Sequence, residues 1–460
     1  LYCLGGPVDL APLYANERPV SVPGHPLARE PILKHLNPGR WTDAPAPHTV
    51  HGVQWSAALD LEPAATWVDA PVIVLHDGVA AEQEGWRFVS STQWDEDGAA
   101  QVLGATQATV IVVLPQFLAR QAARFACASF TARLTQAALA TVDAVCRASG
   151  KEAAINLSFV LPTGESLEDL SYAAIAGALK SVHLELRNAE LKSIFVAPQQ
   201  CVARLPEIID VSRANGSAEY RLDATGVSGV HLVPKTIPAG QPSVLADRAY
   251  VISGGTGSIG VSLALRLVEK GAGQVILLSR GLADTGSRSE RLTWLLETGN
   301  VRLVQVDVTD QAQIATALRD TLPIDAVFHA AGMSTQVAFE QLTVDEVFRV
   351  QASKTEGTLA LFNAAQTLGA GRFITFSSIS SLWGVPQLAH YASANRYQDA
   401  FASRPGLPGP QVLNINWGPW GGDSMASAES LIAFERNGIQ GLLPNAALDA
   451  LFGLLDVGVS

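Results

Sequence analysis

The sequence predicts an α/β protein built from two doubly wound units, of which only the second is expected to hold a cofactor. Short apolar strands alternate with helical stretches in both halves of the chain, the pattern of a mainly parallel sheet covered by helices. A glycine-rich turn follows the first strand of the second half, whereas the strand at 71–75 runs into His76-Asp77-Gly78-Val79 without one. We therefore expect a structural first half and a catalytic second half.

The composition excludes several classes of function. The chain of 460 residues suits two or three domains, and with 48% hydrophobic and 16% charged residues it can bury large cores. Its formal net charge of −12 argues against binding to nucleic acid or to an anionic membrane surface. Because no apolar run reaches about 18 residues and no charged leader region is present, we expect neither a transmembrane helix nor a signal peptide.

The cysteines indicate the compartment. Cys3, Cys127, Cys146 and Cys201 are scattered, without a CxxC pair or a histidine cluster at ligand spacing. We interpret them as buried thiols in a reducing cytoplasm, and we expect no metal site. The start Leu-Tyr-Cys, without Met, suggests a piece of a longer polypeptide.

Three segments make up the expected domain organisation. Residues 1–47 are rich in Pro and Gly without a sustained period, which indicates a linker laid over a neighbouring domain or, alternatively, a disordered tail. Residues 48–235 form the structural unit, and residues 236–460 the catalytic unit, with a Pro- and Gly-containing linker at 234–242. In the structural unit, strands are expected at 71–75, 86–90, 109–114 and 157–161, and helical stretches at 117–148 and 167–188.

The catalytic unit begins with a strand, a glycine-rich turn and a helix. The strand 249–253 and the helix 261–270 flank the residues Gly254, Gly255, Thr256, Gly257, Ser258 and Ile259. Glycines let the backbone approach a pyrophosphate, and the helix N-terminus offers unpaired N–H groups and the positive end of a dipole. This context predicts a dinucleotide site, although glycine-rich turns between strands and helices are common.

The next strand ends in residues that bear on the choice of cofactor. The strand 274–278 is followed by Ser279 and Arg280. A cation at this place suits the 2′-phosphate of NADP, whereas an acidic residue suits the ribose hydroxyl of NAD. An exposed loop arginine without a ligand is the alternative.

Two further strand ends are expected to line the cofactor. The third strand, at 304–308, would bring Asp307 to the adenine, with Val308 beside it. The fourth ends with Ala330, Ala331 and Gly332, small residues that would lie under the nicotinamide ribose. The preceding His329 is expected only to pack or to form local hydrogen bonds.

A phenol, a hydroxyl and an amide converge after the strand at 372–377. Ser378 precedes Tyr391 by thirteen positions and Asn395 follows it by four, a spacing that puts Tyr391 and Asn395 on one helix face. Such a group suits holding and protonating a carbonyl oxygen. Lys354, in the helical stretch 344–368, is the fourth candidate, although a surface position is the ordinary explanation for a single lysine.

Together these residues resemble the short-chain dehydrogenase/reductase superfamily, and specifically the ketoreductase domains of modular polyketide synthases. Ordinary members carry Tyr-x-x-x-Lys, whereas here Asn395 takes the fourth place after Tyr391 and Lys354 lies upstream, an exchange characteristic of these ketoreductases. His-Ala-Ala-Gly and Trp417-Gly418-Pro419-Trp420 complete the set. The resemblance covers nearly the whole chain and implies two Rossmann-like subdomains, the first truncated and without cofactor. Residues 22–29 are similar to a segment that trails the acyltransferase in such synthases.

The resemblance implies that the chain uses NADPH to reduce a 3-oxoacyl thioester carried on an acyl carrier protein. Tyr391 would be the general acid, and Lys354 would supply the nearby cation and hold the ribose hydroxyls. Ser378 would donate a hydrogen bond to the carbonyl oxygen, while Asn395 would support a water relay and fix Lys354. Pro419 is one of the expected cofactor contacts.

Two positions are typical of a stereochemical subtype. The Leu-Asp-Asp motif of ketoreductases that give D-hydroxy products is absent after His-Ala-Ala-Gly. Trp383, five residues after Ser378, is typical of the A-type, which gives L-hydroxy products. Leu388, three residues before Tyr391, replaces the His of A-types that act on epimerised substrates, which favours the A1 subtype. Gln387 and His390 depart from the family pattern and leave the substituent preference open, and an exposed aromatic rim is the alternative for Trp383.

Met425 is the third residue expected to steer the substrate. It lies in 421–437, which we interpret as a lid over the substrate or, alternatively, as a plain surface helix. The expected partners are the acyl carrier protein, which presents a phosphopantetheine-linked chain, and neighbouring synthase domains. An α-keto reductase of a nonribosomal peptide synthetase and a redox-inactive scaffold are the alternative functions.

Overall fold

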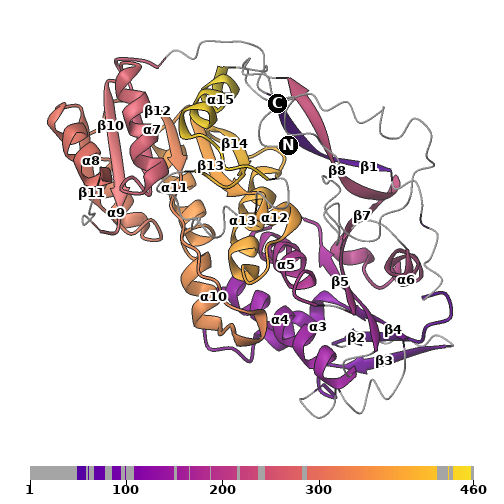
Figure 1. Ribbon diagram of the computed structural model, residues 1–460. Coiled ribbons are helices and arrows are strands. Elements are labelled where there is room, and N and C mark those ends of the chain that lie inside the picture. Colours follow the sequence, from indigo (N-terminus) through magenta and orange to yellow (C-terminus); the bar gives the residue numbers. More distant parts are fainter. Residues whose placement is uncertain are drawn as a thin grey trace.

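The computed structural model of the protein shows two β-sheets that follow one another along the chain (Figure 1). It describes residues 49–57, 61, 67–77, 85–94, 99, 108–149, 153–164, 166–186, 188–214, 218–236, 244–281, 287–421, 434 and 439–456. The expected segment 1–47 and Met425 lie outside these residues, as does most of the predicted lid. The segment limits at 47 and 235 stay predictions.

In the described part of the first half, eight strands form a sheet in the order β1-β8-β7-β6-β5-β4-β2-β3. The strands are β1 Thr49–Ala57, β2 Val72–His76, β3 Trp86–Ser90, β4 Ala108–Val113, β5 Ala154–Pro162, β6 Ala189–Val196, β7 Glu219–Asp223 and β8 Gly226–Thr236. All neighbours are parallel except the pairs β7–β8 and β8–β1. The mainly parallel sheet is therefore confirmed, and β2 to β5 match the four predicted strands to within three residues.

The six strands described in the second half are all parallel, in the order β11-β10-β9-β12-β13-β14. They are β9 Ala249–Ser253, β10 Gln274–Ser279, β11 Val301–Gln305, β12 Ile324–His329, β13 Arg372–Ser378 and β14 Gln411–Trp417. Numbered along this half, the order is 3-2-1-4-5-6, that of a doubly wound dinucleotide-binding sheet. The chain reverses direction across the sheet between β9 and β12, where ligands bind in such folds.

Helices cover both sheets and join their strands. The α-helices are α3 Pro115–Ala122, α4 Phe130–Ser149, α5 Leu167–His183, α6 Leu205–Arg213, α7 Ser258–Glu269, α8 Ser287–Glu297, α9 Gln311–Ala317, α10 Val344–Gln351, α11 Glu356–Thr367, α12 Ser380–Trp383, α13 Ala389–Ala402 and α15 Pro444–Asp456, with short 3₁₀ helices η3 Pro198–Gln200 and η4 Phe339–Gln341. No helix among the described residues is long and apolar enough to cross a membrane.

The expected single helical stretch at 344–368 is wrong, because a turn at 352–355 separates α10 from α11. The hydroxyl of Thr355 donates to the carbonyl of Gln351 at 3.1 Å, and the N–H of Lys354 donates to the same carbonyl at 2.8 Å. A threonine hydroxyl that bonds to a nearby carbonyl competes with regular helix, which accounts for the break. Lys354 therefore lies in the turn between the two helices.

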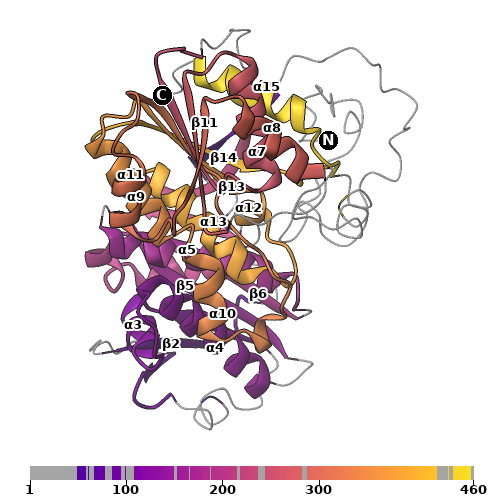
Figure 2. The same cartoon turned by 90° about the vertical axis from the view of Figure 1, so that its left-hand side faces the viewer.

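The two halves meet where α5 packs against α13, which lie side by side in both views (Figure 1 and Figure 2). Gly177 allows this close approach, since a Cβ there would be 2.4 Å from the carbonyl oxygen of Ala392. The apolar residues of α5 belong to cores that both halves share: Leu170 and Ala174 pack in the core that holds Phe373 and Tyr397. The first half thus packs against one face of α13, the helix that carries Tyr391.

A buried ionic group crosses the same interface. Glu219 of β7, 1% exposed, accepts from Lys180 of α5 at 2.5 Å and also pairs with Arg396 of α13. Burial alone would raise the pKa of Glu219, but Arg396 and Lys180 hold that pKa below its usual value. Because removing one partner of such a group leaves a buried charge uncompensated, it ties α13 to the first sheet.

We predict that Gly177→Ala lowers the free energy of unfolding by about 1–3 kcal/mol, the usual range for overpacking a close contact. Gly281→Ala is the matched control, since a Cβ at Gly281 would meet nothing within 4 Å. Urea unfolding of both variants measures the difference. Equal stability of the two variants would show that α5 and α13 separate without cost.

Candidate active site

The predicted site residues of the second half gather at one edge of its sheet. Gly254 follows β9, Ser279 ends β10, Ala330 follows β12, Ser378 ends β13 and Pro419 lies just beyond β14. Since the strands are parallel, their carboxyl ends share one edge, where doubly wound sheets bind ligands. The structure thus brings together residues that lie far apart in the sequence.

The glycine turn lies against the end of β12. Gly254 has a φ of 70°, and a Cβ there would be 2.9 Å from the backbone N of Ala331. A Cβ at Gly260, in the first turn of α7, would be 2.4 Å from the carbonyl oxygen of Gly254. Gly257 is the N-cap of α7 and makes no side-chain capping bond. The turn therefore presents bare backbone and the N-terminus of α7, a shape that fits a pyrophosphate.

Two predicted cofactor residues are hydrogen-bonded to each other at the end of β10. The hydroxyls of Thr256 and Ser279 are 2.8 Å apart, and Ser279 donates to the carbonyl of Gly281 at 2.9 Å. The adjacent Arg280 is exposed, while its carbonyl accepts from Gln305 at 3.0 Å. The backbone at Arg280 is therefore fixed and its guanidinium is accessible to a ligand.

Asp307 lies beyond the third strand, which ends at Gln305 rather than at 308 as expected. Its Oδ1 accepts from the N–H of Thr309 at 2.9 Å and from its hydroxyl at 2.8 Å. An aspartate that bonds to the backbone two residues on forms a turn, which ends the strand early. Val308 is buried, and a Cβ at Gly357 would be 3.1 Å from it.

A buried hydrogen-bond chain holds the segment after β12. His329 is fully buried; its Nδ1 accepts from the Ser253 hydroxyl at 2.7 Å, and its Nε2 donates to the Ser353 carbonyl at 2.9 Å. The N–H of Ala331 donates to Ser253 at 3.2 Å. Burial, with Lys354 nearby, lowers the pKa of His329 to about 3, so the ring is neutral. This confirms the expectation that His329 bonds locally.

Tyr391, Ser378 and Asn395 meet between β13 and α13. Burial raises the pKa of Tyr391, and hydrogen bonds from the side chains of Asn395 and Ser378 oppose that rise. Asn395 is fully buried, and its Nδ2 donates to the Tyr391 carbonyl at 2.8 Å. Within the described part of the chain, its Oδ1 has no partner. A buried acceptor left open in this way has room in its bonding for a water or a ligand.

Lys354 is 2% exposed and reaches the same region from the turn before α11. Its Nζ donates to the Phe376 carbonyl at 2.6 Å and to Oε1 of Gln398 at 3.1 Å. The Asn395 amide donates to the Tyr391 carbonyl, so Gln398 is the helix α13 side chain that bonds directly to the lysine. Burial lowers the pKa of Lys354 to about 7, and the carboxylate of Asp399 opposes that fall.

Asp399 is a further residue of the site that the sequence analysis missed. This carboxylate, 6% exposed, accepts from the hydroxyls of Ser377 at 2.6 Å and Ser381 at 2.5 Å. It also accepts from the amides of Asn414 at 2.9 Å and Asn416 at 2.8 Å. The two asparagines stand two residues apart among the apolar residues 412–417 of β14, a signal that could have predicted a buried polar partner. The network fixes the segment around Ser378 to α13.

Trp383 and Leu388, the described residues expected to steer the substrate, flank a short loop between α12 and α13. Both are half-buried. Gln387 in this loop has a φ of 63°, and its N–H donates to Glu185 of the first half at 2.9 Å. The other carboxylate oxygen of Glu185 accepts from the N–H of Phe339 at 3.2 Å. Glu185 therefore holds the loop and the segment after β12 together.

Pro419 lies in a short connection that packs on the sheet edge. Its carbonyl accepts from the N–H of Leu442 at 2.7 Å, and the rings of Trp417 and Trp420 meet edge to face with centroids 5.1 Å apart. This packing fixes the chain that leads into the predicted lid.

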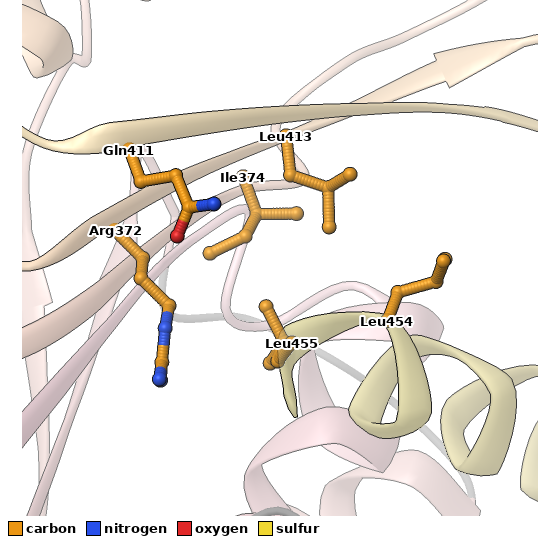
Figure 3. Close-up of a pocket in the computed structure, with 6 residues that line it drawn as sticks. All are labelled: Arg372, Ile374, Gln411, Leu413, Leu454 and Leu455. Atoms are coloured by element: carbon orange, nitrogen blue, oxygen red, sulfur yellow. The ribbon is translucent and has the colours of Figure 1, made fainter. Parts of the chain in front are cut away.

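A small pocket lies away from these residues (Figure 3). It has a volume of about 10 Å³, enough for at most one water, and lies between α15 and the strands β13 and β14. Arg372 and Gln411 in its wall begin their strands, so the pocket is at the amino edge of the sheet, opposite the candidate site. No cluster of potential metal ligands occurs among the residues that the structure describes.

A glycine turn follows the first strand of the second sheet, and the fifth strand ends near Tyr391. This arrangement is that of the short-chain dehydrogenases/reductases, a class of oxidoreductases. Residues 248–422 match the family model described as KR domain, and this part of the chain belongs to the KR, or ketoreductase, family.

The relatives support this assignment. The chain is 32% identical over 333 residues to the erythronolide synthase EryA3 of Saccharopolyspora erythraea, a match that covers 70% of this chain but only 10% of the relative. Two solved structures share the fold, each at 22% identity and over 89% of this chain. The A-type ketoreductases from a modular polyketide synthase superpose with a TM-score of 0.72 over 91% of that chain, and a C2-type ketoreductase with 0.73 over 93%. The fold therefore does not distinguish these types.

Proposed function

We propose that the chain reduces the 3-oxo group of an acyl thioester, presented by an acyl carrier protein, to an L-configured 3-hydroxyl with NADPH. The observation that carries the proposal is that Tyr391 and Ser378 are hydrogen-bonded at the sheet edge where the glycine turn also lies, with the ammonium of Lys354 on the carbonyl of Phe376, two residues before Ser378. The polyketide synthases among the relatives support a carrier-bound substrate and neighbouring synthase domains as partners, in the cytoplasm.

The residues of the turn fit a dinucleotide. Gly254 and Gly260 allow the turn to fold tightly against Ala331 and the start of α7, where a Cβ would clash with the backbone, and α7 directs its N-terminus to this turn. The exposed Arg280 suits a 2′-phosphate, which favours NADPH over NADH. When bound, NADPH supplies the hydride that reduces the ketone.

The protein's own groups hold the carbonyl oxygen and give it a proton. Ser378 donates a hydrogen bond to that oxygen as it gains negative charge, and Tyr391 delivers the proton from its hydroxyl. A phenol with a raised pKa is fully protonated at neutral pH, so Tyr391 still holds the proton that it donates when the substrate binds. The ammonium of Lys354 stabilises the phenolate that remains, and the open Oδ1 of Asn395 orients the water that returns the proton.

The half-buried Trp383 and Leu388 line the substrate's approach and select the face of the ketone that is reduced. Glu185 holds their loop through Gln387. The identities of Trp383 and Leu388 favour the A1 subtype and hence an L-configured alcohol without epimerisation of the neighbouring carbon.

Turnover of racemic 2-methyl-3-oxopentanoyl thioester tests the proposal. We expect consumption of NADPH, with chiral analysis giving the L-configured 3-hydroxyl and an unepimerised 2-methyl group. A D-configured product would retain the reductase and reject the role of Trp383. Absence of NADPH binding would reject the proposed function.

Tyr391→Phe should lower kcat by about 10²–10⁴-fold while leaving the Kd of NADPH nearly unchanged, because only the transferable proton is lost. Tyr397→Phe is the matched control: it removes a hydroxyl from the same helix, where the ring packs in the core. Steady-state kinetics and cofactor titration by fluorescence measure both quantities. Retained turnover in Tyr391→Phe would show that another group is the acid.

Arg280→Ala should weaken NADPH binding about tenfold or more and leave NADH binding unchanged, because the guanidinium pairs only with the 2′-phosphate. The control is Arg319→Ala, which removes an exposed cation near the end of α9. Isothermal titration with each dinucleotide gives the two Kd values. An equal loss for NADPH and NADH would return Arg280 to an ordinary exposed position.

A further inference from the structure

The ammonium of Lys354 is bound by neutral acceptors. Its Nζ donates to the Phe376 carbonyl and to Oε1 of Gln398, and both lysine and glutamine are buried. An ammonium has three N–H donors, so these two bonds leave one for a ligand hydroxyl. The direction of that third donor depends on what holds the other two.

Gln398 is locked in one orientation by a closed ring of hydrogen bonds. The hydroxyl of Thr358 donates to the Lys354 carbonyl at 2.7 Å, and Nε2 of Gln398 donates to the Thr358 oxygen at 3.1 Å. Because the Thr358 proton is already used, its oxygen can only accept, and the amide must present Nε2 to it. Oε1 is then left facing Nζ, as an acceptor that an ammonium requires.

Gln398 also shares a helix face with the predicted acid. Tyr391, Asn395 and Gln398 stand at positions i, i+4 and i+7 of α13, and such positions line one side of a helix. One rigid element therefore sets the phenol, the open amide oxygen and the acceptor for the lysine at fixed separations. Asn395 and Gln398 are fully buried, so neither side chain can exchange its partners with bulk water.

We propose that Gln398 is a positioning residue that keeps Lys354 in its ammonium form and aims its third N–H at the cofactor ribose and the phenol of Tyr391. This inference rests on the proposed function and extends it to a residue whose side chain touches neither substrate nor cofactor. Thr358 acts one step further out, by fixing the orientation of the Gln398 amide.

The charges around Lys354 show why a neutral acceptor matters there. Asp399 on α13 is the carboxylate that raises the pKa of Lys354, and it is shared among Ser377, Ser381, Asn414 and Asn416. His329 on β12 is neutral and Tyr391 on α13 is protonated, so neither supplies a negative charge that would oppose the lowering of the Lys354 pKa by burial. Glu356 is the first residue of the adjoining α11. With a pKa lowered to about 7, the ammonium is lost as pH rises through that value, and activity that needs it falls on the alkaline side.

The test compares pH profiles of kcat for Gln398→Leu and Gln398→Glu in the full chain. Loss of the acceptor in Gln398→Leu should move the alkaline limb to lower pH by about one unit, which lowers the ammonium fraction, and with it kcat, about fivefold at pH 7. A carboxylate in Gln398→Glu should move that limb to higher pH. Shifts in opposite directions are not expected from a merely structural role, so an alkaline limb that stays in place in both variants overturns the proposal.

Gln351→Leu is the matched control, because this buried glutamine bonds to Thr135 and Ser393 and not to the ammonium. It should lower stability without moving the alkaline limb. If Gln398→Leu does not fold, Thr358→Val carries the test: it frees the amide of Gln398 to turn and should move the limb to lower pH, and an unchanged limb overturns the proposal.

Lys354→Met separates this inference from the proposed function. If Lys354→Met keeps full activity, the reductase stands but the lysine has no catalytic role, and the inference about Gln398 is rejected. If the unaltered chain neither binds NADPH nor reduces the thioester, the proposed function itself fails. If Lys354→Met is inactive while Gln398→Leu keeps the original pH profile, the proposed function stands and only the role of Gln398 is rejected.

Discussion

The two halves of the chain are held at short range by the contact between Gly177 of α5 and Ala392 of α13. It sets the distance between the two halves, since a Cβ at Gly177 would be 2.4 Å from the Ala392 carbonyl. The residue before Ala392 is Tyr391, and the same helix carries Asn395, Gln398 and Asp399. A half of the chain without a glycine turn of its own thereby helps to determine where the proposed acid lies, through packing and through the ion pairs of Glu219.

Several buried polar groups in the site are fully hydrogen-bonded. Asp399 accepts from four side chains, and His329 is bonded at both ring nitrogens. Against this background, the open Oδ1 of Asn395 stands out, because a buried acceptor without a partner costs free energy unless something binds it. The pKa of Lys354, which burial lowers, is a second unfavourable feature, and such shifts are concentrated at functional sites. Hydrogen bonds thus fix Asp399 and His329, whereas the acceptor of Asn395 is left for a further partner.

Local patterns in the sequence predicted most of the fold and part of the site. Strand–turn–helix periodicity located β9, its glycine turn and α7, and the spacing of Ser378, Tyr391 and Asn395 placed them together. The turn at Lys354 was not predicted, because hydroxyl bonds within 351–355 override a continuous helical pattern. Gln398, Asp399 and Glu185 were not predicted either. Their partners lie between 15 and 202 positions away along the chain, so no local period reveals them. Residue 425 stays a prediction.

The ion pair between Glu219 and Arg396 bears on how such a chain can be recombined with others. The matched family segment begins at residue 248, so a joint made there would separate Arg396, 12% exposed at its side chain, from the carboxylate that neutralises it. The loop at Gln387 would lose Glu185 in the same step. Both halves must therefore be transferred together if the site is to stay intact. An exchange of the second half alone would need compensating substitutions on both sides of the interface between the two halves.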